Sequence, residues 1–300
     1  MPTVETTAAH EWHLSVGGAH LYCREVGEGQ PVFVLHGGPS FDHNYLLPGM
    51  DRLAEGLRVI YYAQRGRGLS ADGVEPGDIT MESEIEDLDA IRKSLSLDAI
   101  ALIGHSWGGF LAMQYAIAHP NHVSHLLLMH SAPASAGGWS LLTDIFERHR
   151  PLRDREVLDR VGESSLYAAG DLSAEAEYNR AHFRMTLPDV YLLDELVGRI
   201  RVNFTPATVL KARHIGKRLY EQTWQTPGFD LLPELRRLDV PTLVLSAEHD
   251  FIPVEIAREI ADAMPRCRLV VFDRCGHFSW LERPEDVFAH VTRFISRTAD

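Results

Sequence analysis

Short, almost uninterrupted apolar runs alternate with segments of helical periodicity along most of this chain. A strand that is covered on both faces appears as a continuous apolar run, because neither face meets water. Strands of this kind that alternate with helices form parallel βαβ units. The expected strands lie at 32–35, 58–62, 100–103, 125–130, 242–246 and 268–272, and the expected helices at 81–95, 107–119, 254–263 and 285–297. We therefore expect an α/β fold with a mostly parallel, doubly wound sheet.

The chain departs from this alternation in two places. Residues 11–26 alternate in polarity around Gly17-Gly18, which predicts an N-terminal hairpin. Residues 135–229 show mostly helical patterns, contain no convincing buried strand and are bounded by turn-rich stretches. We predict an α/β core formed by residues 1–134 and 230–300, with a helical cap inserted at 135–229.

Composition and charge narrow the choice of partner. The net charge of −13 disfavours nucleic acid and anionic membranes as partners. We expect a small molecule or short peptide as substrate. The N-terminal sequence lacks the pattern of a secretory signal, and no apolar run approaches the roughly 20 residues of a membrane span. The 3 cysteines form neither a disulfide framework nor a metal cluster. We expect a cytoplasmic protein, and its oligomeric state is left open.

One apolar run ends in the stretch GHSWGG, residues 104–109, before helical periodicity resumes. This G-x-S-x-G pattern is either an ordinary tight turn or a nucleophile elbow, which holds a serine hydroxyl out of the sheet. A serine nucleophile needs a base, and the base needs a carboxylate that orients it. Asp250 and His277 each follow one of the last two predicted strands. Their order and their shared sheet edge favour a catalytic triad of Ser106, Asp250 and His277.

Two further parts of the site follow from this assignment. Glu248 could also be the carboxylate that orients the histidine. We prefer Asp250 because Asp250 lies deeper in the loop. Acyl transfer also needs hydrogen-bond donors aimed at a developing oxyanion. The backbone N–H of Trp107, at a helix N-terminus, is one candidate, and the N–H of Gly38 in the HGGP stretch is the other.

The HGGP stretch at 36–39, the QRGRGLS stretch at 64–70, the GHSWGG stretch, Asp250 and Gly276-His277 resemble the α/β-hydrolase superfamily, and more narrowly its proline iminopeptidase branch. The stretch at 41–56 resembles the helix that this branch places between the first two motifs. The resemblance covers both core segments and is weak in the cap. It implies a cofactor-free serine peptidase, with His36 and Gly37 beside the substrate.

One residue departs from that pattern. These peptidases bind the α-amine of their substrate with acidic side chains, one of which commonly follows the triad aspartate, and here that position is Phe251. We therefore keep proline iminopeptidase-like cleavage of an ester or amide beside a carboxylesterase, a lactonase and a C–C bond hydrolase. A non-catalytic ligand-binding protein on the same fold is the alternative from another class. The 16 histidines include no H-E-x-x-H spacing, so we expect neither a metal nor a cofactor.

Overall fold

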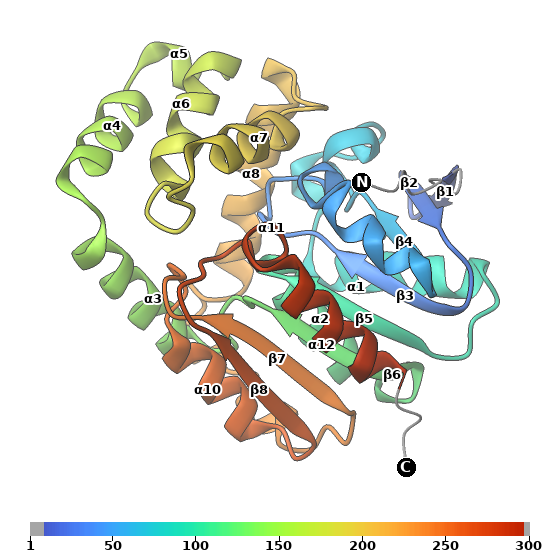
Figure 1. Cartoon of the computed structure of the whole chain (residues 1–300). Helices are drawn as coiled ribbons and strands as arrows, with labels where there is room; N and C mark the ends of the chain where they lie inside the picture. The colour runs from blue at the N-terminus through green and yellow to red at the C-terminus, as the bar shows by residue number, and fades with distance from the viewer. Residues whose placement is uncertain (1–8, 297–300) are drawn as a thin grey trace.

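The computed structural model describes residues 9–296, and its centre is a single sheet of eight strands (Figure 1). The strands are β1 (His10–Val16), β2 (Ala19–Val26), β3 (Gln30–Leu35), β4 (Leu57–Tyr62), β5 (Ile100–His105), β6 (Val123–Met129), β7 (Thr242–Ala247) and β8 (Cys267–Phe272). Their order is β1-β2-β4-β3-β5-β6-β7-β8, and every pair beyond β2 and β4 is parallel. The expected mostly parallel sheet and N-terminal hairpin are confirmed. The expectations for residues 1–8 and 297–300 lie outside the described residues.

Helices cover both faces of the sheet, as the continuous apolar strands predict. α1 (Met81–Ser94), α2 (Trp107–Ala118) and α10 (Val254–Ala263) pack on one face, and α12 (Pro284–Ile295) packs on the other. Along β3, Phe33 and Leu35 belong to the first apolar cluster, whereas Val32 and Val34 belong to the second. Each central strand therefore contributes side chains to two cores, which explains its lack of polar alternation. The sheet is doubly wound.

β8 is an exception to this coverage. Only Phe272 of the strand is fully buried, and Val271 is 36% exposed. β8 is the last strand of the sheet and pairs only with β7, so fewer neighbours cover its faces. The expectation that this apolar run is buried on both faces is wrong.

The helix expected at 41–56 is also wrong in type. Two short 3-10 helices, η1 (His43–Leu46) and η2 (Gly49–Glu55), replace it. Leu47, which precedes Pro48, is extended, with φ −95° and ψ 151°. A residue before proline is disfavoured in helical conformation, so the segment breaks there. The remaining short helices are η3 (Gly68–Ser70), η4 (Pro76–Asp78), η5 (Pro120–His122), α9 (Leu232–Leu235) and α11 (Ser279–Glu282).

Seven helices lie between β6 and β7 in the chain, and the first six of them form a layer beside the sheet (Figure 1). These six are α3 (Ala136–His149), α4 (Leu152–Gly162), α5 (Ser165–Ala168), α6 (Leu172–Phe183), α7 (Val190–Ile200) and α8 (Pro206–Gln222). We call α3 to α8 the helical insertion. Its two ends lie side by side, because Ser135 and Asp230 form an isolated antiparallel bridge. The insertion therefore leaves and rejoins the sheet layer at one place.

Two expectations about the chain as a whole can be compared with the structure. Cys23, Cys267 and Cys275 are free thiols. Within residues 9–296, none of the helices combines the length and the hydropathy that a membrane span requires.

Candidate active site

Ser106 lies in the sharp turn between β5 and α2. Its φ of 56° and ψ of −119° fall in a region that residues with a side chain rarely occupy. A Cβ on Gly104 or on Gly108 would collide with neighbouring backbone atoms, so this turn requires glycine on both sides of the serine. The Ser106 hydroxyl makes no hydrogen bond with the described residues, and Ser106 lines a cavity together with His277. The local sequence thus builds a turn that presents a free hydroxyl to a cavity.

Asp250 and His277 form a buried pair above the ends of β7 and β8. His277 Nδ1 lies 2.9 Å from Asp250 Oδ1, which also accepts the Ile252 backbone N–H at 2.9 Å. A carboxylate only accepts hydrogen bonds, so the His277 Nδ1 carries the proton and its Nε2 has a free lone pair. Burial lowers the pKa of His277 below its ordinary value, although Asp250 acts in the opposite direction. The rival Glu248 is exposed and has no such contact.

Sequence reasoning missed a second histidine on the same carboxylate. His130 Nδ1 lies 2.7 Å from Asp250 Oδ2, and His130 Nε2 lies 2.7 Å from Ser279 Oγ. Burial raises the pKa of Asp250, but its interactions with His277 and His130 outweigh burial and hold that pKa below the ordinary value. His130 directly follows β6, at the same sheet edge as Asp250 and His277. That position is the signal that could have identified it.

The helical insertion contributes to the position of the two loops that hold this pair. Thr186 Oγ1 accepts the His277 backbone N–H at 2.8 Å and donates to the His249 backbone oxygen at 3.1 Å. A Cβ on Gly276 would collide with the backbone oxygen of Thr186, so the close contact requires glycine there. One threonine of the insertion therefore links the loop after β7 to the loop after β8.

Two backbone N–H groups near Ser106 have no acceptor within the described residues. They belong to Trp107, the first residue of α2, and to Gly38, which has a φ of 126°. The first N–H groups of a helix have no intrahelical partner, and they favour negative charge. Both residues line the cavities next to Ser106. The pair can therefore donate to a negatively charged oxygen at this point.

The first half of the HGGP stretch is engaged in the core. The Gly37 N–H donates to Tyr45 Oη at 2.7 Å, and Tyr45 Oη donates to His105 Nδ1 at 2.7 Å. Gly37 lines the smaller cavity. His36 is fully buried, its Nε2 accepts the Gln64 N–H at 3.1 Å, and it lines neither cavity next to Ser106. The structure therefore brings Gly37 to the cavity but not His36, whose buried ring binds the backbone of Gln64 instead.

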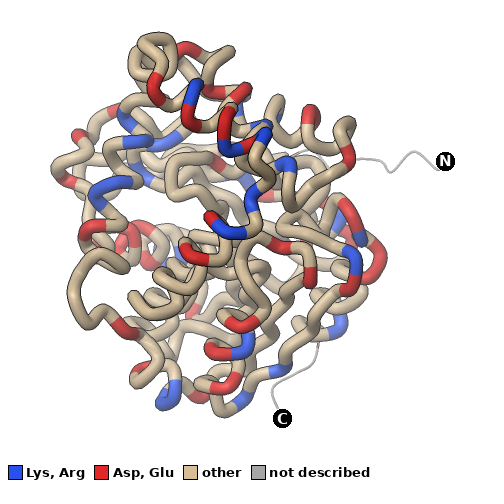
Figure 2. Tube along the Cα trace, turned by 90° about the vertical axis from the view of Figure 1, so that its left-hand side faces the viewer, with Lys and Arg blue, Asp and Glu red and all other residues tan. Residues whose placement is uncertain are grey.

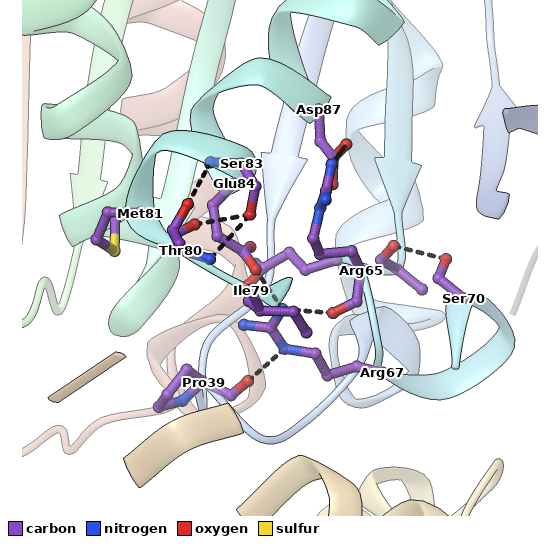
Figure 3. A network of polar contacts seen from close by, with 12 residues as sticks. Pro39, Arg65, Arg67, Ser70, Ile79, Thr80, Met81, Ser83, Glu84 and Asp87 are labelled. Carbon is purple, nitrogen blue, oxygen red and sulfur yellow. Dashed lines mark hydrogen bonds and ion pairs between the residues drawn. The ribbon is translucent and has the colours of Figure 1, made fainter. Parts of the chain in front are cut away.

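Two buried ion pairs lie next to the HGGP loop and help to hold it in place (Figure 3). Arg67 Nε donates to the Pro39 backbone oxygen at 2.8 Å, and its Nη1 donates to Glu84 at 2.5 Å. Arg65 forms two hydrogen bonds with Asp87. Breaking a buried pair by removing one partner costs roughly 3–5 kcal/mol. The QRGRGLS stretch thus anchors the residues that follow Gly38 to α1.

Two cavities meet at Ser106, with volumes of about 70 Å³ and about 240 Å³. Gly38, Ser106, His182 and Phe251 line both of them. The ring centroid of Phe251 lies 4.3 Å from that of His277. The position where an acidic residue would meet a substrate amine therefore holds an aromatic ring packed against the histidine.

The same cluster supplies a set of atoms that are close enough to share a metal. His130, Asp250 and His277 each offer one ligand atom, and these atoms lie within 4.8 Å of one another. Both Asp250 oxygens already accept hydrogen bonds from the imidazoles, at 2.7 and 2.9 Å. A metal would have to replace both bonds, so the donor set fits a hydrogen-bonded cluster better than a metal site.

Comparison with known proteins agrees with this architecture. Residues 30–284 match the family model described as alpha/beta hydrolase fold, and the chain belongs to that family. Within the family, its sequence is similar to proline iminopeptidases. The enzyme of Lactobacillus delbrueckii subsp. lactis is 29% identical over 91% of this chain and 93% of its own length.

Solved structures give the same result for the fold. The crystal structure of proline iminopeptidase from Mycobacterium smegmatis has a TM-score of 0.70 and 25% identity, and the match covers 95% of this chain and 97% of that one. A meta-cleavage product hydrolase from Pseudomonas fluorescens has a TM-score of 0.73 at 20% identity, over 95% of this chain and 97% of the other. The chain is therefore an α/β hydrolase whose sequence is similar to those of proline iminopeptidases.

Proposed function

We propose that this protein is a serine hydrolase that cleaves a small ester or amide through an acyl-enzyme. Ser106 is the nucleophile, His277 the general base and Asp250 the carboxylate that orients it. The Asp250–His277 hydrogen bond carries this proposal, because it leaves the Nε2 lone pair of a buried, neutral imidazole free beside Ser106. The Gly38 and Trp107 N–H groups are the oxyanion donors.

The reaction follows from these roles. Ser106 Oγ attacks the substrate carbonyl carbon while His277 Nε2 takes the hydroxyl proton. The bond to the leaving group then breaks, and His277 returns that proton to the departing oxygen or nitrogen. A water molecule attacks the acyl-enzyme, again through His277, and releases the acid and the free serine. Asp250 stays ionised throughout and stabilises the imidazolium that forms twice in each cycle.

The names of the relatives support an amide bond next to an N-terminal proline, and one observation favours a different substrate. Phe251 packs against His277 at the position where a carboxylate would hold the substrate amine. An unpaired buried ammonium is costly, and a cation–π contact recovers only about 0.5–2 kcal/mol. We therefore favour ester cleavage in the manner of a carboxylesterase or lactonase, with residues 135–229 as the cap that selects the substrate.

A serine-directed organophosphonate tests the proposed chemistry. It should abolish hydrolysis of p-nitrophenyl acetate and add its mass to the peptide that contains Ser106, because only an activated serine displaces the leaving group from phosphorus. EDTA should leave turnover unchanged. A protein that turns over no ester and takes no label would be a binding protein. Loss of activity on chelation that zinc restores would contradict a serine mechanism.

His130 is expected to hold Asp250 for catalysis, and a pair of variants separates that role from a structural one. His130→Gly removes the donor to Asp250 Oδ2 and should lower kcat about tenfold, since a hydrogen bond to a charged group contributes about 1.5–3 kcal/mol. His130→Asn keeps an N–H at the δ position and tolerates the φ of 50° at this residue. It should stay within about threefold of the wild-type kcat.

The pH dependence of kcat/KM tests the role of His130 in a way that a loss of folded protein would not imitate. The acidic limb of kcat/KM should lie below pH 6.5 in the wild type, because burial lowers the pKa of the base His277. Without the His130 donor, the Asp250 charge acts more strongly on the His277 imidazolium, so the limb should move to higher pH in His130→Gly. His130→Asn should restore it. An unchanged limb in both variants would mean that His130 only fills space.

A further inference from the structure

The two cavities that meet at Ser106 differ in size and in their relation to the reacting groups. The smaller one, of about 70 Å³, is lined by His277 and by Gly37, and its other walls include Phe41 and Phe278. The larger one, of about 240 Å³, is lined by Trp107 and Pro39 and does not reach His277. A substrate bonded to Ser106 therefore has two distinct spaces for the two sides of its scissile bond.

The mechanism decides which side enters which space. His277 must protonate the leaving group, so the leaving group lies on the side of the cavity that His277 lines. The acyl oxygen points to the N–H groups of Gly38 and Trp107, and Trp107 lines only the larger cavity. The acyl chain therefore extends into the larger cavity, and the smaller cavity receives the alcohol or amine.

Several aromatic rings contribute to the wall of the larger cavity. Trp139 of α3 and Trp224 lie parallel, with ring centroids 4.4 Å apart and planes inclined by 4°. The ring centroid of Tyr220 of α8 lies 5.1 Å from that of Trp139, and Phe146 of α3 also lines the cavity. The Trp224 Nε1–H donates to the Pro133 backbone oxygen at 2.9 Å and so presents no polar atom there. Such a wall matches a flat or branched apolar group.

No Asp, Glu, Lys or Arg among residues 9–296 lines the larger cavity. Six carboxylates of the insertion are engaged elsewhere: Glu175 pairs with Arg213, Glu177 with Arg160, Asp194 with Arg180, Glu195 with Arg199 and Glu221 with Lys217, and Asp189 caps α7. Figure 2 shows acidic and basic residues interspersed in this part of the chain. Arg150 stacks on Phe146, 3.9 Å from its ring centroid, and does not line the cavity.

The polar groups that do face the larger cavity are neutral. Burial lowers the pKa of His182 to about 3, so its imidazole carries no charge at neutral pH. Burial raises the pKa of Tyr220 to about 12, so its phenol stays protonated. Neither side chain makes a hydrogen bond within the described residues. They can satisfy a carbonyl or hydroxyl group of a substrate, but they cannot neutralise an ammonium or a carboxylate.

We propose that the natural substrates are esters with a bulky, uncharged, apolar acyl group, aromatic or branched, and a small alcohol. This inference rests on the proposed serine hydrolase function and adds the assignment of the two cavities to it. It separates this chain from the substrate class in the names of its relatives, because a proline residue with a free N-terminus brings a cation into the larger cavity.

Two matched pairs of substrates test both halves of the proposal with the wild-type protein. Methyl 3-phenylpropanoate and 2-phenylethyl acetate are isomers that place the phenyl ring on opposite sides of the ester. The first should be cleaved with a kcat/KM at least about tenfold higher. Methyl cyclopentanecarboxylate should likewise exceed L-proline methyl ester at least about tenfold, because the two acyl rings differ chiefly in the charged nitrogen.

A pair of variants on α3 locates the acyl site. Thr143→Phe narrows the larger cavity, so it should reduce the preference for methyl 3-phenylpropanoate over methyl acetate at least about tenfold. Leu141→Phe adds a ring to an exposed residue two positions away on the same helix and should leave that preference unchanged. If Thr143→Phe instead impairs only 2-phenylethyl acetate, the two cavities are assigned the wrong way round.

The remaining outcomes distinguish the inference from the function on which it rests. The wild type could instead prefer 2-phenylethyl acetate or the proline ester, with all turnover lost in Ser106→Ala. That result would overturn the substrate assignment but leave the proposed serine hydrolase function intact. Turnover of every ester that persists in Ser106→Ala would overturn both, since the cavities would then not surround the nucleophile.

Discussion

Ser106→Ala is expected to lower kcat on every ester by about 10⁶-fold, the loss typical of removing the nucleophile from a serine hydrolase. Alanine keeps the Cβ of serine, so the backbone at φ 56° gains no new strain, and the free hydroxyl leaves no hydrogen-bond partner behind. The thermal unfolding midpoint should therefore stay close to that of the wild type. Initial rates with p-nitrophenyl acetate, measured beside a melting curve, check both statements.

Ser131→Ala is the matched control for this variant. Ser131 lies in the neighbouring loop after β6, is buried, and donates to the Ala132 backbone oxygen at 3.0 Å. Removing its hydroxyl should change kcat by no more than about threefold, because it contacts no reacting group. If Ser106→Ala retained more than about a tenth of the wild-type kcat, the nucleophile would have to be another residue.

Asp250→Asn should lower kcat by about 10⁴-fold, less than the loss of the serine. The carboxylate accepts from three donors, namely the ring nitrogens of His277 and His130 and the Ile252 N–H. An asparagine amide has only one acceptor oxygen, so its NH₂ group must face one of these donors. Either an imidazole changes tautomer or a hydrogen bond is lost, and the negative charge that stabilises the His277 imidazolium disappears in both cases.

Glu248→Gln provides the comparison for Asp250→Asn. Glu248 is exposed two residues away and touches neither histidine, so its amide variant should keep kcat within about twofold. If Glu248→Gln lowered kcat strongly and Asp250→Asn lowered it only slightly, the orienting carboxylate would be Glu248 and not Asp250. Steady-state kinetics of the two purified variants at one pH are sufficient to decide.

Patterns within short segments predicted the fold and the central site residues. The strands and helices follow from apolar runs and helical periodicity, because burial of a segment on one face or two is set largely by its own residues. The elbow at Ser106 is equally local, since glycine at 104 and 108 permits the turn. The order of the chain through a parallel sheet then placed Asp250 and His277 at the same edge.

The tertiary structure alone decided the contacts between segments that are far apart in sequence. His130 meets Asp250 across 120 residues, and Thr186 joins the loops at 249 and 277. The exposure of β8 likewise depends on its place as the last strand of the sheet rather than on its apolar content.

The larger cavity beside Ser106 was also decided by the tertiary structure. Trp139, Tyr220 and Trp224 come from α3, from α8 and from the segment after it, and they meet only because the insertion folds back to the edge that holds Ser106. An amphipathic helix specifies which of its faces is buried but not which neighbour buries it. The residues of the proposed triad could therefore be chosen from the sequence, whereas the shape and charge of the larger cavity depend on how the insertion packs against the sheet.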